Sequence, residues 1–221
     1  MSSNIAELNA GFDANSDPLE LIRKGLELAK NPVLTTNFGP HEGVILHMCT
    51  QVKPDIPVIW MDSGYATAKT YHVAEELTQK LNLNLHVYNP LWSAARRNAV
   101  MDIHPQPGDE SILDHPRYEE FKQQVKMEPF ARAMKAWAPD VWFTAIRAQQ
   151  NENRAGLEPA SMELDGMLQG GVLRLAPVFH WSTKQMFEYL RDNQLPNVEW
   201  EEYFDPTKLR LDLECGLHIQ K

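Results

Sequence analysis

Residues 33–65 read VLTTNFGPHEGVILHMCTQVKPDIPVIWMDSGY, and this stretch decides the fold. It begins as a short apolar strand, continues from 42 to 52 as a largely apolar helix, and ends in a second strand at 54–64. An amphipathic helix at 67–82 and a third strand at 83–90 follow. Such alternation is typical of parallel strands joined by crossover helices. The sequence therefore predicts an α/β fold whose mostly parallel, twisted sheet is flanked by helices.

Later segments extend this pattern. Residues 92–116 are rich in Pro, Asp, Gly and Ser, which favours an irregular insertion with one short helix at 93–99. Apolar periodicity and capping signals predict the remaining elements. These are a helix at 119–137, strands at 140–145 and 170–179, and a helix that begins after Ser182.

The length of 221 residues suits one well-cored domain and is too short for two large ones. We expect a nucleotide-binding α/β domain at 1–194, in which residues 1–16 form an irregular N-terminus. From 195 to 221 the apolar pattern weakens, which predicts a C-terminal tail that is mobile or docks conditionally.

Composition limits the possible classes of function. The formal net charge of −9 repels nucleic acids and anionic membranes, and it repels an anionic ligand unless basic residues gather at the binding site. No apolar run approaches the roughly 18–20 residues that span a membrane, and the N-terminus lacks a signal-peptide pattern, so a cytoplasmic location is expected. The two cysteines form no CxxC, and no histidines pair at i, i+4, which predicts no metal centre and no bound iron–sulfur cluster.

Two turns follow the first two strands, at the sheet edge where ligands bind in open α/β sheets. The first turn precedes a helix N-terminus, which offers N–H groups and a positive dipole end to phosphate or sulfate. Its candidate binding residues are Thr35, Thr36, Asn37, Phe38 and Gly39, although a plain strand–helix loop has the same composition. The second turn adds Asp62, Gly64 and Tyr65, for which an ordinary β-turn is the alternative.

Arginines and one cysteine supply the remaining candidate residues. Arg147 and Arg154 follow the fourth strand and suit forked recognition of phosphate or sulfate, the alternative being a solvated polar loop. Cys215 lies in a polar tail, and an exposed thiol becomes nucleophilic where positive charge favours the thiolate. We therefore predict that Cys215 is the catalytic nucleophile. Cys49 lies in the apolar helix and is expected to be a core residue.

Together these segments resemble the phosphoadenylyl-sulfate (PAPS) reductase family of assimilatory sulfate reduction. The segment VLTTNFGPHEGVILHM at 33–48 looks like that family's modified phosphate-binding loop. Its later elements are matched by the segments at 54–65 and 70–88, by the arginine-bearing segment at 126–156 and by the catalytic signature ECGLH at 214–218. Each segment alone is modest evidence for the resemblance, but the order and spacing of all of them together are specific to the family.

The resemblance implies an adenine nucleotide alpha hydrolase-like fold and a thiol-based reaction. The Cys215 thiolate would attack the sulfonate sulfur of PAPS, adenosine 3′,5′-bisphosphate would leave, and thioredoxin or glutaredoxin would release sulfite from the thiosulfonate. The resemblance also implies an adenine nucleotide substrate, a substrate-binding role for His218, and a homodimer. A related branch reduces adenylyl sulfate with a [4Fe–4S] cluster held by extra cysteines, which this sequence lacks.

Three features depart from the family's pattern. Glu42 stands where the family usually carries a small residue, Ala148 stands where many members have a second arginine, and the arm before ECGLH is shorter. Because like charges repel, either Glu42 points away from the ligand or the ligand is less anionic than PAPS. Two alternatives therefore stay open. One is a divergent member acting on adenylyl sulfate or another adenylated or sulfonated substrate, and the other is a non-catalytic nucleotide-binding partner.

Overall fold

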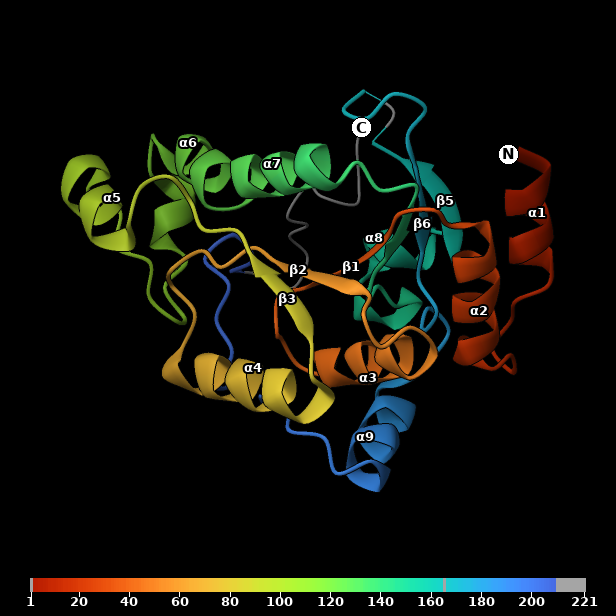
Figure 1. Ribbon diagram of the computed structural model, residues 1–221. Coiled ribbons are helices and arrows are strands. Elements are labelled where there is room, and N and C mark those ends of the chain that lie inside the picture. The colour runs from red at the N-terminus through yellow and green to blue at the C-terminus, as the bar shows by residue number, and fades with distance from the viewer. Residues whose placement is uncertain (1, 165, 210–221) are drawn as a thin grey trace.

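The computed structural model describes residues 2–164 and 166–209, which form an α/β domain around a six-stranded sheet (Figure 1). The order of strands across the sheet is β3-β2-β1-β4-β6-β5. Every neighbouring pair is parallel except β5 and β6, which are antiparallel. The strand bounds are β1 Pro32–Thr36, β2 Pro57–Trp60, β3 Asn84–Val87, β4 Val141–Phe143, β5 Ala160–Glu163 and β6 Val172–Leu175. The predicted fold class is thus confirmed.

Helices fill the connections between these strands, and several begin where the sequence supplies a cap. Asp17 accepts a hydrogen bond from the backbone of Leu19, and Ser182 with Gln185 forms a reciprocal capping box. The π-helical segment η2 (Gln123–Met127) joins α6 to α7, and the short 3₁₀ segments are η1 (Ser111–Asp114) and η3 (Ala148–Gln150). The α-helices are α1 Ser2–Ala10, α2 Pro18–Leu28, α3 Glu42–Val52, α4 Ala68–Leu81, α5 Ala94–Met101, α6 Tyr118–Lys122, α7 Glu128–Trp137, α8 Glu152–Ala155 and α9 Thr183–Asp192.

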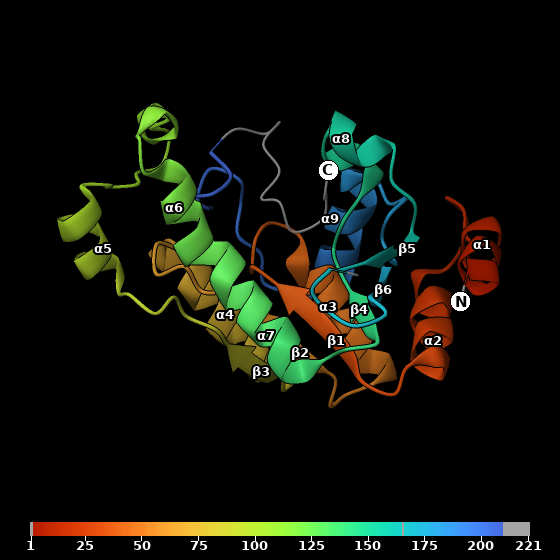
Figure 2. The same ribbon diagram turned by 90° about the horizontal axis from the view of Figure 1, so that it is seen from above.

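Alternate residues of the strands feed two cores, because successive side chains point to opposite faces of a sheet. Leu34 and Phe143 pack with α2, α3, α4 and α9, whereas Val33 and Trp142 pack with α7. Figure 1 shows α3 and α4 on one face and α7 on the other, and Figure 2 shows α1 and α5 at opposite ends of the sheet. Cys49 is fully buried in the first core, which confirms its predicted structural role.

The N-terminus differs from the prediction of an irregular segment at 1–16, because residues 2–10 form α1. Leu8 and Phe12 are buried, and the side chain of Asn9 exchanges two hydrogen bonds of 2.9 Å with the backbone of Ala160 in β5. Asn9 thereby joins α1 to the edge strand β5, a strand that the sequence did not predict. Tertiary contacts of this kind stabilise short helices that local patterning does not reveal.

Residues 195–209, the first part of the predicted tail, pack against the domain. Leu195, Val198 and Phe204 are buried, so this segment is docked in the structure. Residues 210–221 lie outside the described part of the chain. Among the helices that the structure describes, none is long and apolar enough to cross a membrane.

Candidate active site

A pocket opens at the carboxyl ends of β1 and β4, where strand order reverses in the sheet. Ligands of open α/β sheets bind at such a position. The empty space in this pocket is about 740 Å³ when the open solvent at its mouth is included. Its lining residues are Thr35, Thr36, Asn37, Gly39, Pro40, Glu42, Met61, Lys126, Thr144, Ala145, Ile146, Gln150, Arg154, Trp200, Tyr203, Asp205 and Lys208.

Most backbone N–H groups of the loop between β1 and α3 donate hydrogen bonds to side chains of the protein. Phe38 N donates to Thr36 Oγ1 at 3.0 Å, and Gly39 N donates to Asn37 Oδ1 at 3.1 Å. His41 N donates to Asn197 Oδ1 at 2.8 Å. The sequence predicted that these N–H groups would face an anion. In the structure, side chains rather than the loop backbone supply most of the pocket's donors.

Two threonine hydroxyls at the strand ends are available as donors. Thr35 Oγ1 accepts a 2.8 Å hydrogen bond from Trp142 Nε1, which leaves its own hydrogen for another acceptor. Thr144 Oγ1 is buried and has no hydrogen-bond partner within the described residues. A buried hydroxyl without a partner costs free energy unless a ligand or water satisfies it. Both hydroxyls line the pocket, so they form a polar floor suited to an anionic oxygen.

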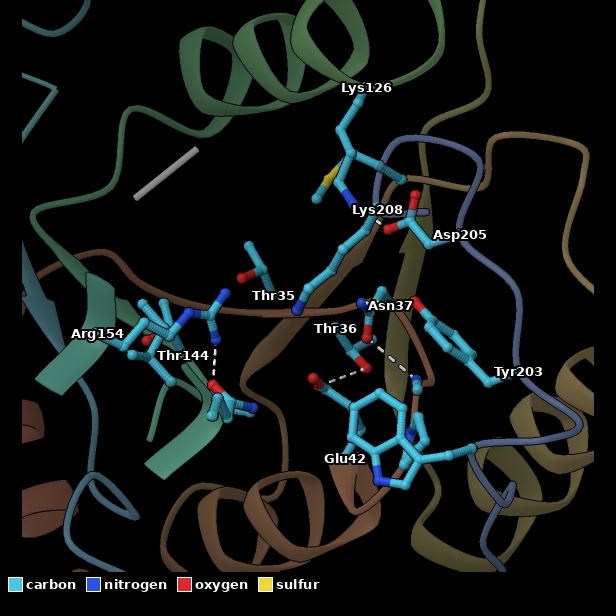
Figure 3. Close-up of a pocket in the computed structure, with 17 residues that line it drawn as sticks. Thr35, Thr36, Asn37, Glu42, Lys126, Thr144, Arg154, Tyr203, Asp205 and Lys208 are labelled. Atoms are coloured by element: carbon cyan, nitrogen blue, oxygen red, sulfur yellow. Dashed lines mark hydrogen bonds and ion pairs between the residues drawn. The ribbon is translucent and has the colours of Figure 1, made fainter. Parts of the chain in front are cut away.

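Three basic side chains surround this floor although the chain as a whole is acidic. Lys126 projects from η2, Arg154 from α8, and Lys208 from the C-terminal segment, as Figure 3 shows. Lys126 Nζ lies 2.5 Å from Asp205 Oδ2, and Arg154 donates to Gln150 Oε1. Basic side chains thus gather at this pocket in an acidic chain, as the binding of an anionic ligand requires.

Glu42 points into this pocket rather than away from it (Figure 3). Its Oε2 accepts a hydrogen bond from Thr36 Oγ1 at 3.1 Å. Burial raises the pKa of the Glu42 carboxyl to about 7, against the hydrogen bond from Thr36 and the charges of Arg154, Lys208 and Lys126, which lower it. The structure thus excludes the alternative in which Glu42 points away from the pocket. A neutral Glu42 carboxyl, which the raised pKa favours, has no charge to repel a ligand, so a highly anionic ligand stays compatible with this position.

The structure brings five of the predicted binding residues together at the pocket: Thr35, Thr36, Asn37, Gly39 and Arg154. Phe38 instead packs in the core against Trp60, with ring centroids 4.9 Å apart. Arg147 is buried and donates to the backbone oxygen of Trp181 at 3.1 Å, so its guanidinium is engaged in the fold.

The second turn lies beside the pocket and not in its lining. Asp62 Oδ1 accepts from Gly64 N and from the Tyr71 hydroxyl, each at 2.9 Å, and Asp62 lines a smaller adjacent cavity. The Tyr65 hydroxyl is hydrogen-bonded to the Asn98 side chain, away from the pocket. Cys215 and His218 fall outside the described residues, so their predicted roles remain predictions.

Sequence reasoning missed several residues that line the pocket. Lys126 lies in a helix with other charged residues, and no local pattern separates it from a solvated lysine. Thr144 reads as a strand residue, while Tyr203, Asp205 and Lys208 belong to the segment predicted as tail. The one available signal was that Thr144 lies near the carboxyl end of a predicted apolar strand. Among the described side chains, no three His, Cys, Asp or Glu residues gather in a way that could hold a metal ion.

The sheet order and the pocket at its carboxyl edge define the class of protein, one with an adenine nucleotide alpha hydrolase-like fold. A family model described as the phosphoadenosine phosphosulfate reductase domain matches residues 31–202. The chain therefore belongs to the phosphoadenosine phosphosulfate reductase family, and it is an oxidoreductase.

Named relatives agree with this assignment. The chain is 35% identical over 215 residues to the phosphoadenosine 5′-phosphosulfate reductase of Vibrio cholerae, covering 88% of this chain and 80% of that protein. It is 34% identical over 241 residues to that of a Synechococcus species, covering 98% and 97%. The solved PAPS reductase of Candida auris, a phosphate complex, shares the fold with a TM-score of 0.73 and 23% identity over 89% of each chain.

Proposed function

We propose that this protein reduces PAPS to sulfite and adenosine 3′,5′-bisphosphate in sulfate assimilation, with Cys215 as nucleophile. The observation that carries the proposal is the gathering of Lys126, Arg154 and Lys208 around the threonine floor in a chain of net charge −9. Basic side chains bind phosphate and sulfate oxygens through charge-assisted hydrogen bonds. Membership of the phosphoadenosine phosphosulfate reductase family supports PAPS as the substrate.

The chemistry needs two sulfur-transfer steps. In the first, the Cys215 thiolate attacks the sulfonate sulfur, and the bond from that sulfur to the bridging oxygen breaks. The electron pair stays on the departing 5′-phosphate, and a cysteine thiosulfonate forms. In the second, one thiol of thioredoxin or glutaredoxin attacks the Cys215 sulfur and expels sulfite. The second thiol of that donor then restores the Cys215 thiol, so the two electrons come from a dithiol that becomes a disulfide.

Intact mass spectrometry tests the first step directly. The protein is incubated with PAPS in the absence of any reductant, so the second step cannot proceed. The expected result is the gain of one sulfonate group, located on Cys215 by peptide mapping and absent in a Cys215→Ser variant. Cleavage of PAPS to adenosine 3′,5′-bisphosphate without any covalent adduct on the wild-type chain would overturn the proposed mechanism.

Replacement of Thr144 by valine tests the pocket floor. Valine has nearly the same shape but no hydroxyl, so PAPS affinity is expected to fall about fivefold through loss of one hydrogen bond. Stability is expected to stay equal or rise, because a buried hydroxyl without a protein partner is removed. Calorimetric titration and denaturant unfolding measure the two effects.

The matched control is Thr50→Val in α3. The Thr50 hydroxyl already donates to Leu46 O at 2.8 Å, and Thr50 is not among the residues that line the pocket. PAPS affinity should be unchanged in this variant. Equal affinity of Thr144→Val and wild type would show that the Thr144 hydroxyl does not bind the ligand.

Adenylyl sulfate is a second candidate substrate, favoured by the position of Glu42 in the pocket. It lacks the 3′-phosphate and carries less negative charge than PAPS, so a nearby carboxylate repels it less. Measurement of kcat/KM for both nucleotides with a thioredoxin system decides between them. The electron donor and a homodimeric assembly are part of the proposal, and size-exclusion chromatography with light scattering tests the latter.

A further inference from the structure

Glu42 is an acidic side chain in a pocket otherwise suited to anions, and it has few partners. In the described part of the chain, the Thr36 hydroxyl is the one hydrogen-bond partner of the Glu42 side chain. This hydroxyl contacts only Oε2 of Glu42. Glu42 also forms no ion pair with a described basic residue, and it is half-buried. Its second oxygen, Oε1, is therefore available to a ligand in the pocket.

The charged groups that face Glu42 come from three separate elements. Arg154 of α8, Lys126 of η2 and Lys208 of the C-terminal segment all act on the carboxylate electrostatically. The neighbouring His41 does not contribute a charge, because burial, with a smaller effect of Arg147, lowers the pKa of its imidazole to about 4. Asp205 lines the same pocket and is paired with Lys126.

Ligand binding changes this balance. An incoming anion engages the same three basic side chains that favour the ionised form of Glu42, and its own charge repels the carboxylate. Both effects favour the neutral carboxyl once the pocket is occupied. A carboxyl group, unlike a carboxylate, can donate a hydrogen bond to an anionic oxygen.

We propose that Glu42 takes up one proton from solvent when a sulfate-bearing nucleotide enters the pocket, and that the neutral carboxyl then donates a hydrogen bond from Oε1 to that ligand. Glu42 is thus a ligand-binding residue. The inference rests on the proposed function only in that the ligand is an anion. Anion binding at this site should therefore be coupled to the uptake of one proton by Glu42.

Burial already favours this change, since it raises the pKa of Glu42 to about 7 in the free protein. Above that pH the free carboxyl is ionised and must be protonated on binding, so affinity falls about tenfold for each unit of rising pH. Below pH 7 the group is already neutral in the free protein, and affinity no longer changes through Glu42. A Glu42→Gln variant keeps a donor that does not titrate, so this dependence should vanish in it.

Isothermal titration calorimetry counts the proton. Adenylyl sulfate is titrated at pH 8 into the full chain carrying Cys215→Ser, which prevents covalent transfer, in buffers with different ionisation enthalpies. This nucleotide has no group that titrates near neutral pH, so any proton uptake belongs to the protein. We expect close to one proton with Glu42 present and none with Glu42→Gln. Equal uptake in the two proteins, or none in either, would overturn the proposal.

The hydrogen bond is tested separately with Glu42→Ala, which removes both the charge and the donor. At pH 8 Glu42→Gln should bind adenylyl sulfate about fivefold or more tightly than Glu42→Ala does. Equal affinity of these two variants would show that relief of repulsion is the whole effect, and that the carboxyl donates nothing.

A second measurement applies even if the chain binds neither nucleotide, in which case the proposed function fails. Inorganic sulfate is added to protein labelled with ¹³C at the glutamate carboxyls, and the Glu42 signal is assigned by its loss in Glu42→Gln. Sulfate should raise the midpoint of the Glu42 titration. An unchanged midpoint while other pocket signals respond to sulfate would overturn the proposal independently of any reductase activity.

Discussion

Replacement of Cys215 by serine is expected to lower the rate of sulfite formation from PAPS by about a thousandfold or more. Serine lacks an acidic thiol, so the variant cannot form the thiosulfonate that the second step requires. Binding of PAPS should be nearly unchanged, because the groups that line the pocket are intact. Sulfite release with a thioredoxin system and calorimetric binding measure the two quantities.

Cys49→Ala is the matched control for this experiment. Cys49 is fully buried, and burial raises the pKa of its thiol far above the ordinary range, so it is inert as a nucleophile. The variant should keep its turnover when measured well below its unfolding temperature. Undiminished sulfite release by Cys215→Ser would refute the assignment of the nucleophile, whatever the control shows.

Replacement of Lys126 by methionine is expected to lower the free energy of unfolding by about 3–5 kcal/mol, because it leaves the buried Asp205 without its ionic partner. Lys126 and Asp205 have side chains 11% and 8% exposed, and their charged atoms are 2.5 Å apart. Asp205 also accepts hydrogen bonds from Thr207 N and Oγ1. Denaturant unfolding at pH 7 measures the loss.

The pH dependence of this loss has a definite sign. Burial acts to raise the pKa of Asp205, but the charge and hydrogen bond of Lys126, with Thr207, hold it below its ordinary value. A depressed pKa contributes stability that is present above the unfolded-state pKa and is lost as pH falls through the folded-state pKa. The loss of unfolding free energy in Lys126→Met should therefore be full at pH 7 and should become smaller as pH falls below about 4.

Lys122→Met provides the control, one helical turn earlier on the same segment. Lys122 pairs with Glu119 at 2.8 Å, but Glu119 is 75% exposed, and exposed pairs contribute at most about 1 kcal/mol. Stability of Lys122→Met close to wild type, together with a large loss in Lys126→Met, is the expected pattern. Equal small losses in both would mean that the Lys126–Asp205 pair does not fix residues 195–209 on the domain.

The sequence by itself determined the α/β class, the order of the main strands and helices, and the loop after β1 as part of the site. These features depend on local periodicity, on caps such as Ser182, and on turn residues, all of which are encoded by residues close together in the chain. The core role of Cys49 followed in the same way, because it lies inside an apolar helix. The prediction of Cys215 rests on the sequence and on the family, and it awaits the experiments above.

Tertiary structure alone decided which residues share the pocket. Lys126, Thr144 and Lys208 come from three different segments, and their meeting depends on how η2, β4 and residues 195–209 pack. Packing also turned Arg147 toward the backbone of Trp181 and formed α1 against β5. The tertiary structure also sets the pKa of Glu42, through burial and through charges on residues that are distant in the sequence. Contacts between segments that are distant in the chain leave no periodic pattern in the sequence. The sequence therefore located the site at the loop after β1 but did not predict which other residues line it.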